Sequence, residues 1–230
     1  AAKAALDKYG SGWAGSRFLN GTLDLHVQLE KELAEFVGKD EALCFSTGFS
    51  VNQGVLAMVV GRNDYIICDD RDHASIVDGR RLSFATQLHY KHNDMEDLER
   101  VIQKLPHDAV KLIVVDGVFS MEGDLAKLPE IVELKHKYNC SIMVDEAHGI
   151  GVFGRNGRGV CDYFGIGVLC NVLVVVLALS GDDNDLACAE IFKHRLSRDG
   201  SAARSENERL FALYLNAVVH NEVFNGETVG

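Results

Sequence analysis

Short apolar runs alternate with amphipathic stretches along most of the chain. Runs such as "VKLIVVDG" and "SIMVDEAH" are apolar at successive positions before their polar ends, as in strands that are buried on both faces of a sheet. Between these runs apolar residues recur every three or four positions, which predicts helices. The alternation indicates an α/β fold with a mostly parallel sheet flanked by helices. The predicted strands are 41–48, 64–70, 86–92, 110–120 and 140–148, and the predicted helices are 23–37, 49–60, 74–84, 95–105 and 129–139.

The run "IGVLCNVLVVVLALS", residues 166–180, is the one candidate for a membrane span. It is shorter than the roughly 20 residues that a membrane-spanning helix needs, and it contains Asn171. Because β-branched valine dominates the run, we expect a buried strand over 172–180 and no transmembrane segment. Helices are expected after this strand.

Composition and charge narrow the function classes. The 230 residues can form one substantial core, and the net charge of −11 with a pI near 5.2 argues against a nucleic-acid partner, which needs a basic face. The six cysteines show no C-x-x-C spacing, and four lie in or beside apolar runs. We therefore expect buried, reduced thiols in a cytoplasmic protein and no metal site. The start, "AAKAALDKYGSG", lacks the apolar core of a signal peptide.

The stretch "IMVDEAHGIGVFG", residues 142–154, fits three different chemistries. "DEAH" is the acidic box of a family of nucleic-acid-dependent ATPases, which also need the phosphate-binding loop G-x-x-x-x-G-K-[ST]. The only Gly-Lys pair, Gly38-Lys39, is followed by Asp40 and lacks the upstream glycine of that loop. The ATPase interpretation is therefore rejected.

A second interpretation is a dinucleotide site in an NAD-dependent dehydrogenase. Gly149, Gly151 and Gly154 form a G-x-G-x-x-G pattern after a predicted strand. The third glycine should open an amphipathic helix, but glycines and charged residues interrupt the sequence "RNGRGVCDYFG" that follows. The acidic residue expected about 20 residues on is also misplaced, since Asp182 lies well beyond that distance. This interpretation stays open as the weaker alternative.

A third interpretation is a site for pyridoxal 5'-phosphate (PLP) at the ends of successive strands. Asp145 ends a predicted buried strand, where a carboxylate can keep the pyridine nitrogen of PLP protonated and make the ring an electron sink. Gly48 permits a tight turn into a helix whose N–H groups suit the phosphate. His73 follows the second strand and is placed to lie on the face of the ring. Together these three features favour the PLP interpretation.

Several long motifs resemble those of the α-oxoamine synthases. These are fold-type I PLP-dependent enzymes that condense an amino acid with an acyl-CoA and release carbon dioxide. The resemblance covers about residues 9–165, which implies that 1–165 is the PLP-binding large domain, incomplete at both ends, and that 166–230 is a divergent tail. The motifs are "YGSGWAGSRFLNGTLDLHVQLEKELAEF", "FSTGFSVNQG", "CDDRDHASIVDG", "VDGVFSMEGDLAKLPEIVEL" and "VDEAHGIGVFGRNGRGVCDYFG".

The resemblance is strongest to bacterial members of the serine palmitoyltransferase type, through "GSRFLNGTLDLH" and "CDDRDHASIVDGRRLS". It implies L-serine and a long-chain acyl-CoA as substrates, a 3-oxo amine as product and a homodimer as the assembly.

The resemblance also implies roles for residues at the matching positions of the cofactor motifs. Asp145 would pair with the pyridine nitrogen, and His148 would donate a hydrogen bond to the phenolic oxygen of the ring. His73 would stack on the ring and orient the substrate carboxylate. Gly48 and Phe49 would offer backbone N–H groups to the phosphate.

Three further residues take implied roles around these. Ser120 would lie beside the ring, while Arg17 and Asn20 would belong to the substrate entrance near the dimer interface. Each has an ordinary competing explanation, such as a helix cap, a loop contact or a surface ion pair. Four histidines have no such setting and are expected to be solvated; they are His89, His92, His107 and His136.

The resemblance stops after Gly165, before the family's Schiff-base lysine. Alignment on "CDYFG" places that lysine near Leu179, and the sequence has no lysine between Lys137 and Lys193. In the family this lysine holds PLP as an activated imine and removes the α-proton of the substrate. A catalytically inactive fragment or pseudoenzyme of the same fold is therefore an alternative, with a tail foreign to the enzyme.

Overall fold

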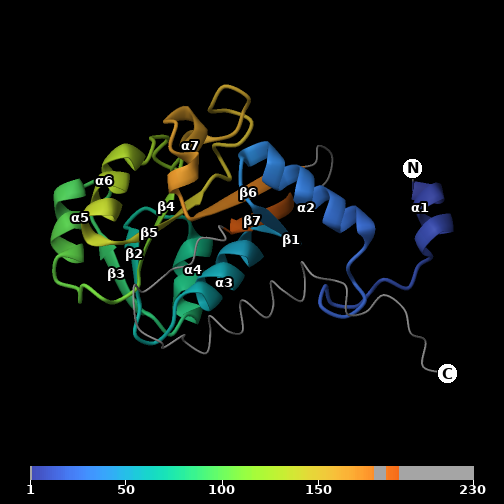
Figure 1. Cartoon of the computed structure of the whole chain (residues 1–230), viewed down its shortest axis with the longest axis horizontal. Coiled ribbons are helices and arrows are strands. Elements are labelled where there is room, and N and C mark those ends of the chain that lie inside the picture. Colours follow the sequence, from blue (N-terminus) through green and yellow to red (C-terminus); the bar gives the residue numbers. More distant parts are fainter. Residues whose placement is uncertain (1, 179–184, 192–230) are drawn as a thin grey trace.

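The computed structural model describes residues 2–178 and 185–191. Within these residues, strands and helices alternate along most of the chain, as the sequence predicts (Figure 1). The strands are β1 (Glu41–Phe45), β2 (Tyr65–Asp69), β3 (Thr86–Tyr90), β4 (Lys111–Asp116), β5 (Ser141–Asp145), β6 (Val172–Ala178) and β7 (Asp185–Ile191). The helices are α1 (Ala2–Tyr9), α2 (Asp24–Val37), α3 (Gly48–Val59), α4 (Ala74–Leu82), α5 (Met95–Ile102), α6 (Leu128–Tyr138), α7 (Val160–Tyr163) and the 3-10 helix η1 (Gly167–Leu169).

In the described part of the chain, seven strands form one sheet in the order β1-β7-β6-β5-β4-β2-β3. Strand β7 runs antiparallel to both of its neighbours, β1 and β6. The pairs formed by β2, β3, β4, β5 and β6 are parallel. The predicted mostly parallel sheet is thus confirmed.

Two hydrophobic clusters, one on each face of the sheet, hold the helices in place. Side chains of β4 alternate, so that Ile113 and Val115 join one cluster while Leu112 and Val114 join the other. Helices α5, α6 and α7 pack on the first cluster, and α3 and α4 pack on the second (Figure 1). Every residue of β4 and β5 is consequently buried, which explains why their sequences are apolar at successive positions.

Side chains and left-handed residues set the ends of the helices beside the sheet. The Thr47 hydroxyl accepts a hydrogen bond from the Ser50 amide at the start of α3, and Asp94 accepts one from the Asp97 amide at the start of α5. Gly38 ends α2 with a φ of 73°, a value that glycine adopts at little cost. Asn139 ends α6 in the same left-handed region.

The segment after residue 165 differs in part from its prediction. Strand β6 occupies most of the predicted strand 172–180, whose last two residues lie outside the described part of the chain. Residues 185–191 form strand β7, where helices were expected. This prediction is wrong because β7 pairs with both β1 and β6, and backbone pairing on two sides overrides local preference. The sheet therefore continues across the predicted domain boundary at residue 165.

None of the helices in the described ranges is long and apolar enough to span a bilayer. Five cysteines are buried thiols, as their sequence setting predicts; they are Cys44, Cys68, Cys140, Cys161 and Cys170.

Candidate functional site

Buried carboxylates gather at the carboxyl-terminal edge of the parallel strands. Asp69, Asp116 and Asp145 are the last residues of β2, β4 and β5, and each is at most 5% exposed. Asp116 and Asp145 lie opposite each other in the register of their two strands. Ligands of open α/β sheets bind outside this edge, so the predicted location of the site at strand ends is consistent with the fold.

A continuous hydrogen-bond network joins Asp145 to His73. The Asn52 amide nitrogen donates to Asp145 Oδ2 at 2.7 Å and to Ser75 Oγ at 2.8 Å. Ser75 Oγ in turn lies 2.7 Å from His73 Nδ1. The backbone N–H of Ala147 donates to Asp145 Oδ1 at 2.9 Å, which fixes the second oxygen of the carboxylate. The two residues on which the PLP interpretation depends therefore share one site.

His73 also begins α4, the helix that follows β2. Its Nδ1 accepts a hydrogen bond from the Ser75 backbone N–H, and its own backbone N–H donates to Asp116 Oδ2 at 2.8 Å. Helix capping, the competing explanation for His73, is thus observed. Because capping uses a nitrogen at the edge of the imidazole, it is compatible with stacking through the face of the ring.

The site gathers three buried carboxyl groups, Asp72, Asp116 and Asp145, whose ionised forms are disfavoured by burial. Burial, followed by the charge of Asp145, raises the pKa of Asp116 to about 8. Burial also raises the pKa of Asp145, although Asn52, the Ala147 amide, His73 and His148 act in the opposite direction. Asp72, which accepts hydrogen bonds from the Asp69 and Asp116 amides, has a pKa raised well above its usual range by burial and by Asp116. A cationic group at this edge would relieve the repulsion.

The raised pKa of Asp116 predicts a pH-dependent stability. Between the ordinary aspartate value of 3.8 and about 8, the unfolded chain loses this proton while the folded chain retains it. Folding therefore loses stability as pH rises through this window, by at most about 1.4 kcal/mol per pH unit. We expect Asp116→Asn, which cannot ionise, to gain stability relative to the wild type over the same window, by at most about 1.4 kcal/mol for each pH unit.

Urea unfolding at a series of pH values measures this difference. A constant difference between variant and wild type from pH 4 to 8 would show that Asp116 ionises normally in the folded chain.

The amino-terminal end of α3 carries the predicted phosphate ligands Gly48 and Phe49. The first backbone N–H groups of a helix have no acceptor within the helix and suit an anion. Asn52, one turn further along α3, reaches Asp145, so the start of this helix lies on the same side of the sheet as Asp145. The Phe49 side chain is 41% exposed and does not belong to the core.

The structure places Ser120 and His148 in exposed positions just beyond strand ends. Ser120 lies four residues after the end of β4, and His148 lies three residues after the end of β5. The charge of His148 is near enough to Asp145 to oppose the rise in the pKa of that carboxyl group. Both residues therefore follow the carboxyl ends of neighbouring strands, and their contacts with PLP stay predictions.

Arg17 and Asn20 have contacts of their own, away from the Asp145 network. Two nitrogens of Arg17 donate to Thr22 Oγ1 and to the Cys44 carbonyl, and Nη2 donates to both oxygens of Glu30 at 2.9 and 3.0 Å. Glu30 is itself only 8% exposed. The Asn20 side chain covers the Cα of Gly15 so closely that a Cβ there would clash. Arg17 thus forms an ion pair, as its competing explanation states, but this pair is largely buried and does not lie at the surface.

The carboxylate of Glu146 explains the glycines that follow β5. Glu146 has no exposed surface and accepts hydrogen bonds from the amides of Val160 and Cys161 at 2.9 and 2.8 Å. A Cβ at Gly149 would lie 2.0 Å from Glu146 Oε2, and one at Gly159 would lie 2.6 Å from its Cδ. These two glycines therefore leave room for the buried Glu146 carboxylate, which accepts hydrogen bonds from the first two amides of α7.

The dinucleotide interpretation is wrong in this geometry. No helix begins at Gly154 in the described chain; turns continue to Gly159, and α7 has only four residues. The Arg155 amide, which follows the third glycine, already donates to Asp162 Oδ2 at 3.1 Å. A pyrophosphate would therefore meet a carboxylate where the fingerprint requires free N–H groups. Asp182 lies outside the described residues.

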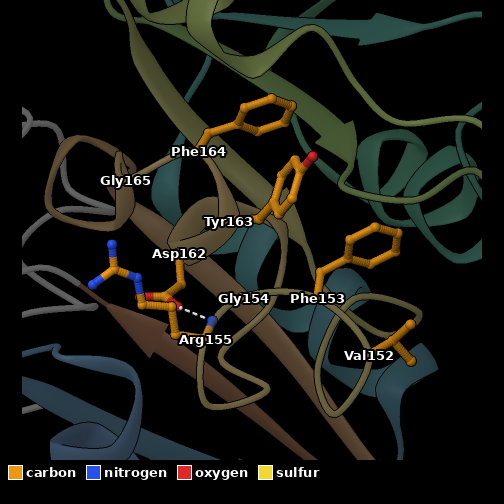
Figure 2. A pocket seen from close by; sticks show the side chains of 8 residues that line it. All are labelled: Val152, Phe153, Gly154, Arg155, Asp162, Tyr163, Phe164 and Gly165. Carbon is orange, nitrogen blue, oxygen red and sulfur yellow. Dashed lines mark hydrogen bonds between the residues drawn. The ribbon is translucent and has the colours of Figure 1, made fainter.

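A cavity of about 800 Å³ opens beside this loop (Figure 2). Three aromatic side chains line it, and Asp162, another lining residue, accepts a hydrogen bond from the Arg155 amide. Its lining residues are Val152, Phe153, Gly154, Arg155, Asp162, Tyr163, Phe164 and Gly165. The cavity is therefore separate from the network of Asp145 and His73.

The family of the chain follows from comparison with known proteins. Residues 1–187 match the model of the family described as aminotransferase class I and II. The chain belongs to this family. The sheet order and the position of Asp145 at a strand end are thus features of an aminotransferase class I and II chain.

Curated relatives of this aminotransferase-family chain include two kinds of enzyme. Serine palmitoyltransferase of Bacteroides thetaiotaomicron is 80% identical over 162 residues, which cover 70% of this chain and 41% of that protein. 8-Amino-7-oxononanoate synthase 1 of Bacillus subtilis is 48% identical over 166 residues, which cover 72% and 42%. The chain spans less than half the length of these relatives.

Solved structures show the same similarity. Serine palmitoyltransferase of Sphingomonas wittichii superimposes with a TM-score of 0.79 at 38% identity, covering 98% of this chain and 52% of that one. A serine palmitoyltransferase variant from S. paucimobilis with a bound PLP–myriocin aldimine gives a TM-score of 0.77 at 39% identity, covering 83% and 48%. The resemblance read from the sequence and the fold-type I architecture are both confirmed.

Residues that the sequence analysis missed complete the network of this aminotransferase-family chain. Asn52 is 1% exposed and Ser75 is 2% exposed, and together they connect Asp145 to His73. A signal for Asn52 was present, because it is a polar residue within the otherwise apolar helix "FSVNQGVLAM". Asp116 had a similar signal, since it ends an apolar strand in the same way as Asp145.

The prediction that His92 is solvated is wrong. Its side chain is 23% exposed and lies between the carboxylates of Asp69 and Asp124. The other three histidines, His89, His107 and His136, are exposed as predicted.

Proposed function

We propose that the described domain is the PLP-binding part of an α-oxoamine synthase, which condenses L-serine with a long-chain acyl-CoA and releases carbon dioxide. The network that joins Asp145, Asn52, Ser75 and His73 at the strand-end edge carries this proposal. It brings together a buried carboxylate and an imidazole from separate parts of the sequence, both of which the resemblance assigns to PLP.

Two properties of the site fit PLP. The pyridine nitrogen is cationic when protonated, and the buried carboxylates Asp72, Asp116 and Asp145 lack a matching buried cation among the contacts that the structure describes. Asn52 Oδ1 is buried and makes no hydrogen bond within the described chain, although buried polar atoms normally have a partner. Both properties are those of a polar site that is completed by a ligand.

When bound, PLP supplies the electron sink that stabilises a carbanion at the α-carbon of the amino acid. Asp145 would hold the proton on the pyridine nitrogen, with Asn52 and the Ala147 amide fixing its two oxygens. His148 would donate a hydrogen bond to the phenolic oxygen. His73 would cover the face of the ring and orient the substrate carboxylate.

The remaining assigned residues would bind and orient at the margins of the site. Gly48 and Phe49 would bind the phosphate through backbone N–H groups at the start of α3. Ser120 would lie beside the ring. Arg17 would act through its ion pair with Glu30, which fixes the segment carrying Asn20 at the substrate entrance.

The named relatives support the choice of substrates. Serine palmitoyltransferases are the relatives of 80% and 54% identity. The assembly would be a homodimer, as the resemblance implies. The buried thiols are consistent with a reducing, cytoplasmic setting.

A second candidate function is PLP binding without turnover. The sequence has no lysine between Lys137 and Lys193, and the expected position near Leu179 lies outside the described residues. A chain without that lysine would lack both the covalent attachment of PLP and the base that removes the α-proton.

Calorimetric titration of the chain with PLP tests the proposed function. We expect saturable binding at one site per chain, and borohydride treatment followed by mass spectrometry separates the two candidates. A borohydride-stable PLP adduct on one lysine supports the enzyme, whereas reversible binding without an adduct supports the inactive form. Heat signals without saturation would contradict both.

A further inference from the structure

The loop that carries Ser120 is a small hairpin between β4 and α6. Val118 and Leu125 form an antiparallel bridge across it, and the Phe119 amide donates to the Asp124 carbonyl at 3.0 Å. Gly123 turns the hairpin with a φ of 74°. We refer to residues 117–126 as the Ser120 loop.

His92 joins this loop to the end of strand β2. Its Nδ1 lies 2.8 Å from Asp69 Oδ1, and its Nε2 lies 3.1 Å from Asp124 Oδ2. The imidazole also forms a T-shaped pair with the ring of Phe119, with centroids 4.5 Å apart and an angle of 88° between the planes. A carboxylate accepts hydrogen bonds and donates none, so two such partners require protons on both ring nitrogens. The geometry therefore indicates a charged imidazolium.

Asn93 makes a second connection beside the first. Its backbone N–H donates to Asp69 Oδ2 at 2.9 Å, while its side-chain amide donates to Asp124 Oδ2 at 2.9 Å and to the Leu125 carbonyl at 3.0 Å. Its Oδ1 accepts a hydrogen bond from the Lys127 amide. Asn93 has a φ of 51°, in the left-handed region, which directs these contacts toward the loop.

We propose that His92 and Asn93 form a clasp that positions the Ser120 loop at the cofactor site. This inference rests on the proposed function only for the role of Ser120 beside PLP. Both residues act through the loop, and neither is assigned a contact with the cofactor. The clasp connects the end of β2, just before His73, to the loop that follows β4, and so fixes two margins of the site relative to each other.

The charge on His92 makes the clasp sensitive to pH. Burial disfavours the charged form, but Asp69 and Asp124 outweigh this and raise the pKa of His92 above 6.5. Of the neighbouring elements, β2 presents Asp69, and the Ser120 loop presents Asp124 together with Glu122, which pairs with Arg71. A raised folded pKa means that the stabilisation is complete below 6.5 and is lost as pH rises through the folded value.

Hydrogen exchange of the Ser120 loop amides tests the clasp in the whole chain. Asn93→Gly keeps the left-handed backbone while removing the side chain, and His92→Phe keeps an aromatic ring while removing both hydrogen bonds. We expect protection factors of the Phe119 and Gly123 amides to fall about tenfold in each variant. His89→Gln is the matched control, because it removes an exposed histidine that also faces an aspartate, at 4.0 Å from Asp70. The loop amides of His89→Gln should have the protection factors of the wild type.

The pH dependence of the protection factors distinguishes a clasp held by charged His92 from a general contribution of these residues to stability. Above pH 6.5, wild-type protection factors, which are corrected for intrinsic exchange, should fall more steeply with pH than those of His92→Phe, because the variant retains only the loss of stability that Asp116 causes. Unchanged protection in Asn93→Gly would overturn the proposal, and so would a pH profile shared by wild type and His92→Phe.

Titration with PLP then tests the positioning role separately. We expect Asn93→Gly to bind PLP about tenfold more weakly than wild type. Wild-type affinity in a variant with a loosened loop would refute positioning at the cofactor site. A wild-type chain that binds no PLP would instead refute the proposed function, with the clasp still decided by hydrogen exchange.

Discussion

Replacing Asp145 with asparagine is expected to weaken PLP binding about 100-fold. Asparagine keeps the shape of the side chain but removes the charge that would hold a protonated pyridine nitrogen at a buried position. Loss of one partner from a buried, hydrogen-bonded charge pair costs about 2–5 kcal/mol, and each 1.4 kcal/mol is a factor of ten in affinity. Calorimetric titration with PLP measures the change.

The stability of the PLP-free chain provides an internal control for Asp145→Asn. Since burial penalises the charge of Asp145 when no cation is present, the variant should be at least as stable as wild type toward urea. Asp70→Asn is the matched substitution at an exposed aspartate near the same edge, and it should leave PLP affinity unchanged. Equal affinities for Asp145→Asn and Asp70→Asn would remove the basis of the proposed function.

Glu146→Ala is expected to reduce the free energy of unfolding by about 4 kcal/mol. The alanine would leave the Val160 and Cys161 amides without acceptors in the interior and would open a cavity between Gly149 and Gly159. Because whole domains are stable by only about 5–15 kcal/mol, urea unfolding curves should show the loss clearly.

Two further substitutions establish the cause of the effect at Glu146. Glu146→Gln retains one acceptor oxygen at nearly the same volume, so it should lose less stability than alanine. Glu133→Ala, at an exposed position of α6, should change the unfolding free energy by less than about 0.5 kcal/mol. If Glu146→Ala were no more destabilising than Glu133→Ala, the buried carboxylate would have no structural role.

Much of the site could be predicted because strand ends are local features of the sequence. An apolar run buried on both faces must be a central strand, and parallel strands place their carboxyl ends at one edge. Asp145, His73 and Gly48 could therefore be grouped before any coordinates were known. The roles assigned to these residues came from the resemblance to a family and stay predictions.

The pairing of β7 and the environment of His92 could not be predicted in the same way. Strand β7 forms because two strands distant in sequence, β1 and β6, present backbone groups on either side of it. His92 contacts Asp69 and Asp124, which are 23 and 32 residues away, so its local sequence suggested a solvated side chain. Long-range contacts of this kind leave no periodic signal.

By itself, the sequence determined the α/β class, the starts of most elements and the carboxylate at the tip of a buried strand, since each depends on residues that are near neighbours. Only the tertiary structure decided that Asn52 and Ser75 connect Asp145 to His73. It also decided that Gly149 and Gly159 accommodate Glu146 and that no helix begins at Gly154, as a dinucleotide fingerprint would require. The physical reason is that hydrogen-bond partners are chosen by distance in space, which the folded sheet sets and the order of residues does not.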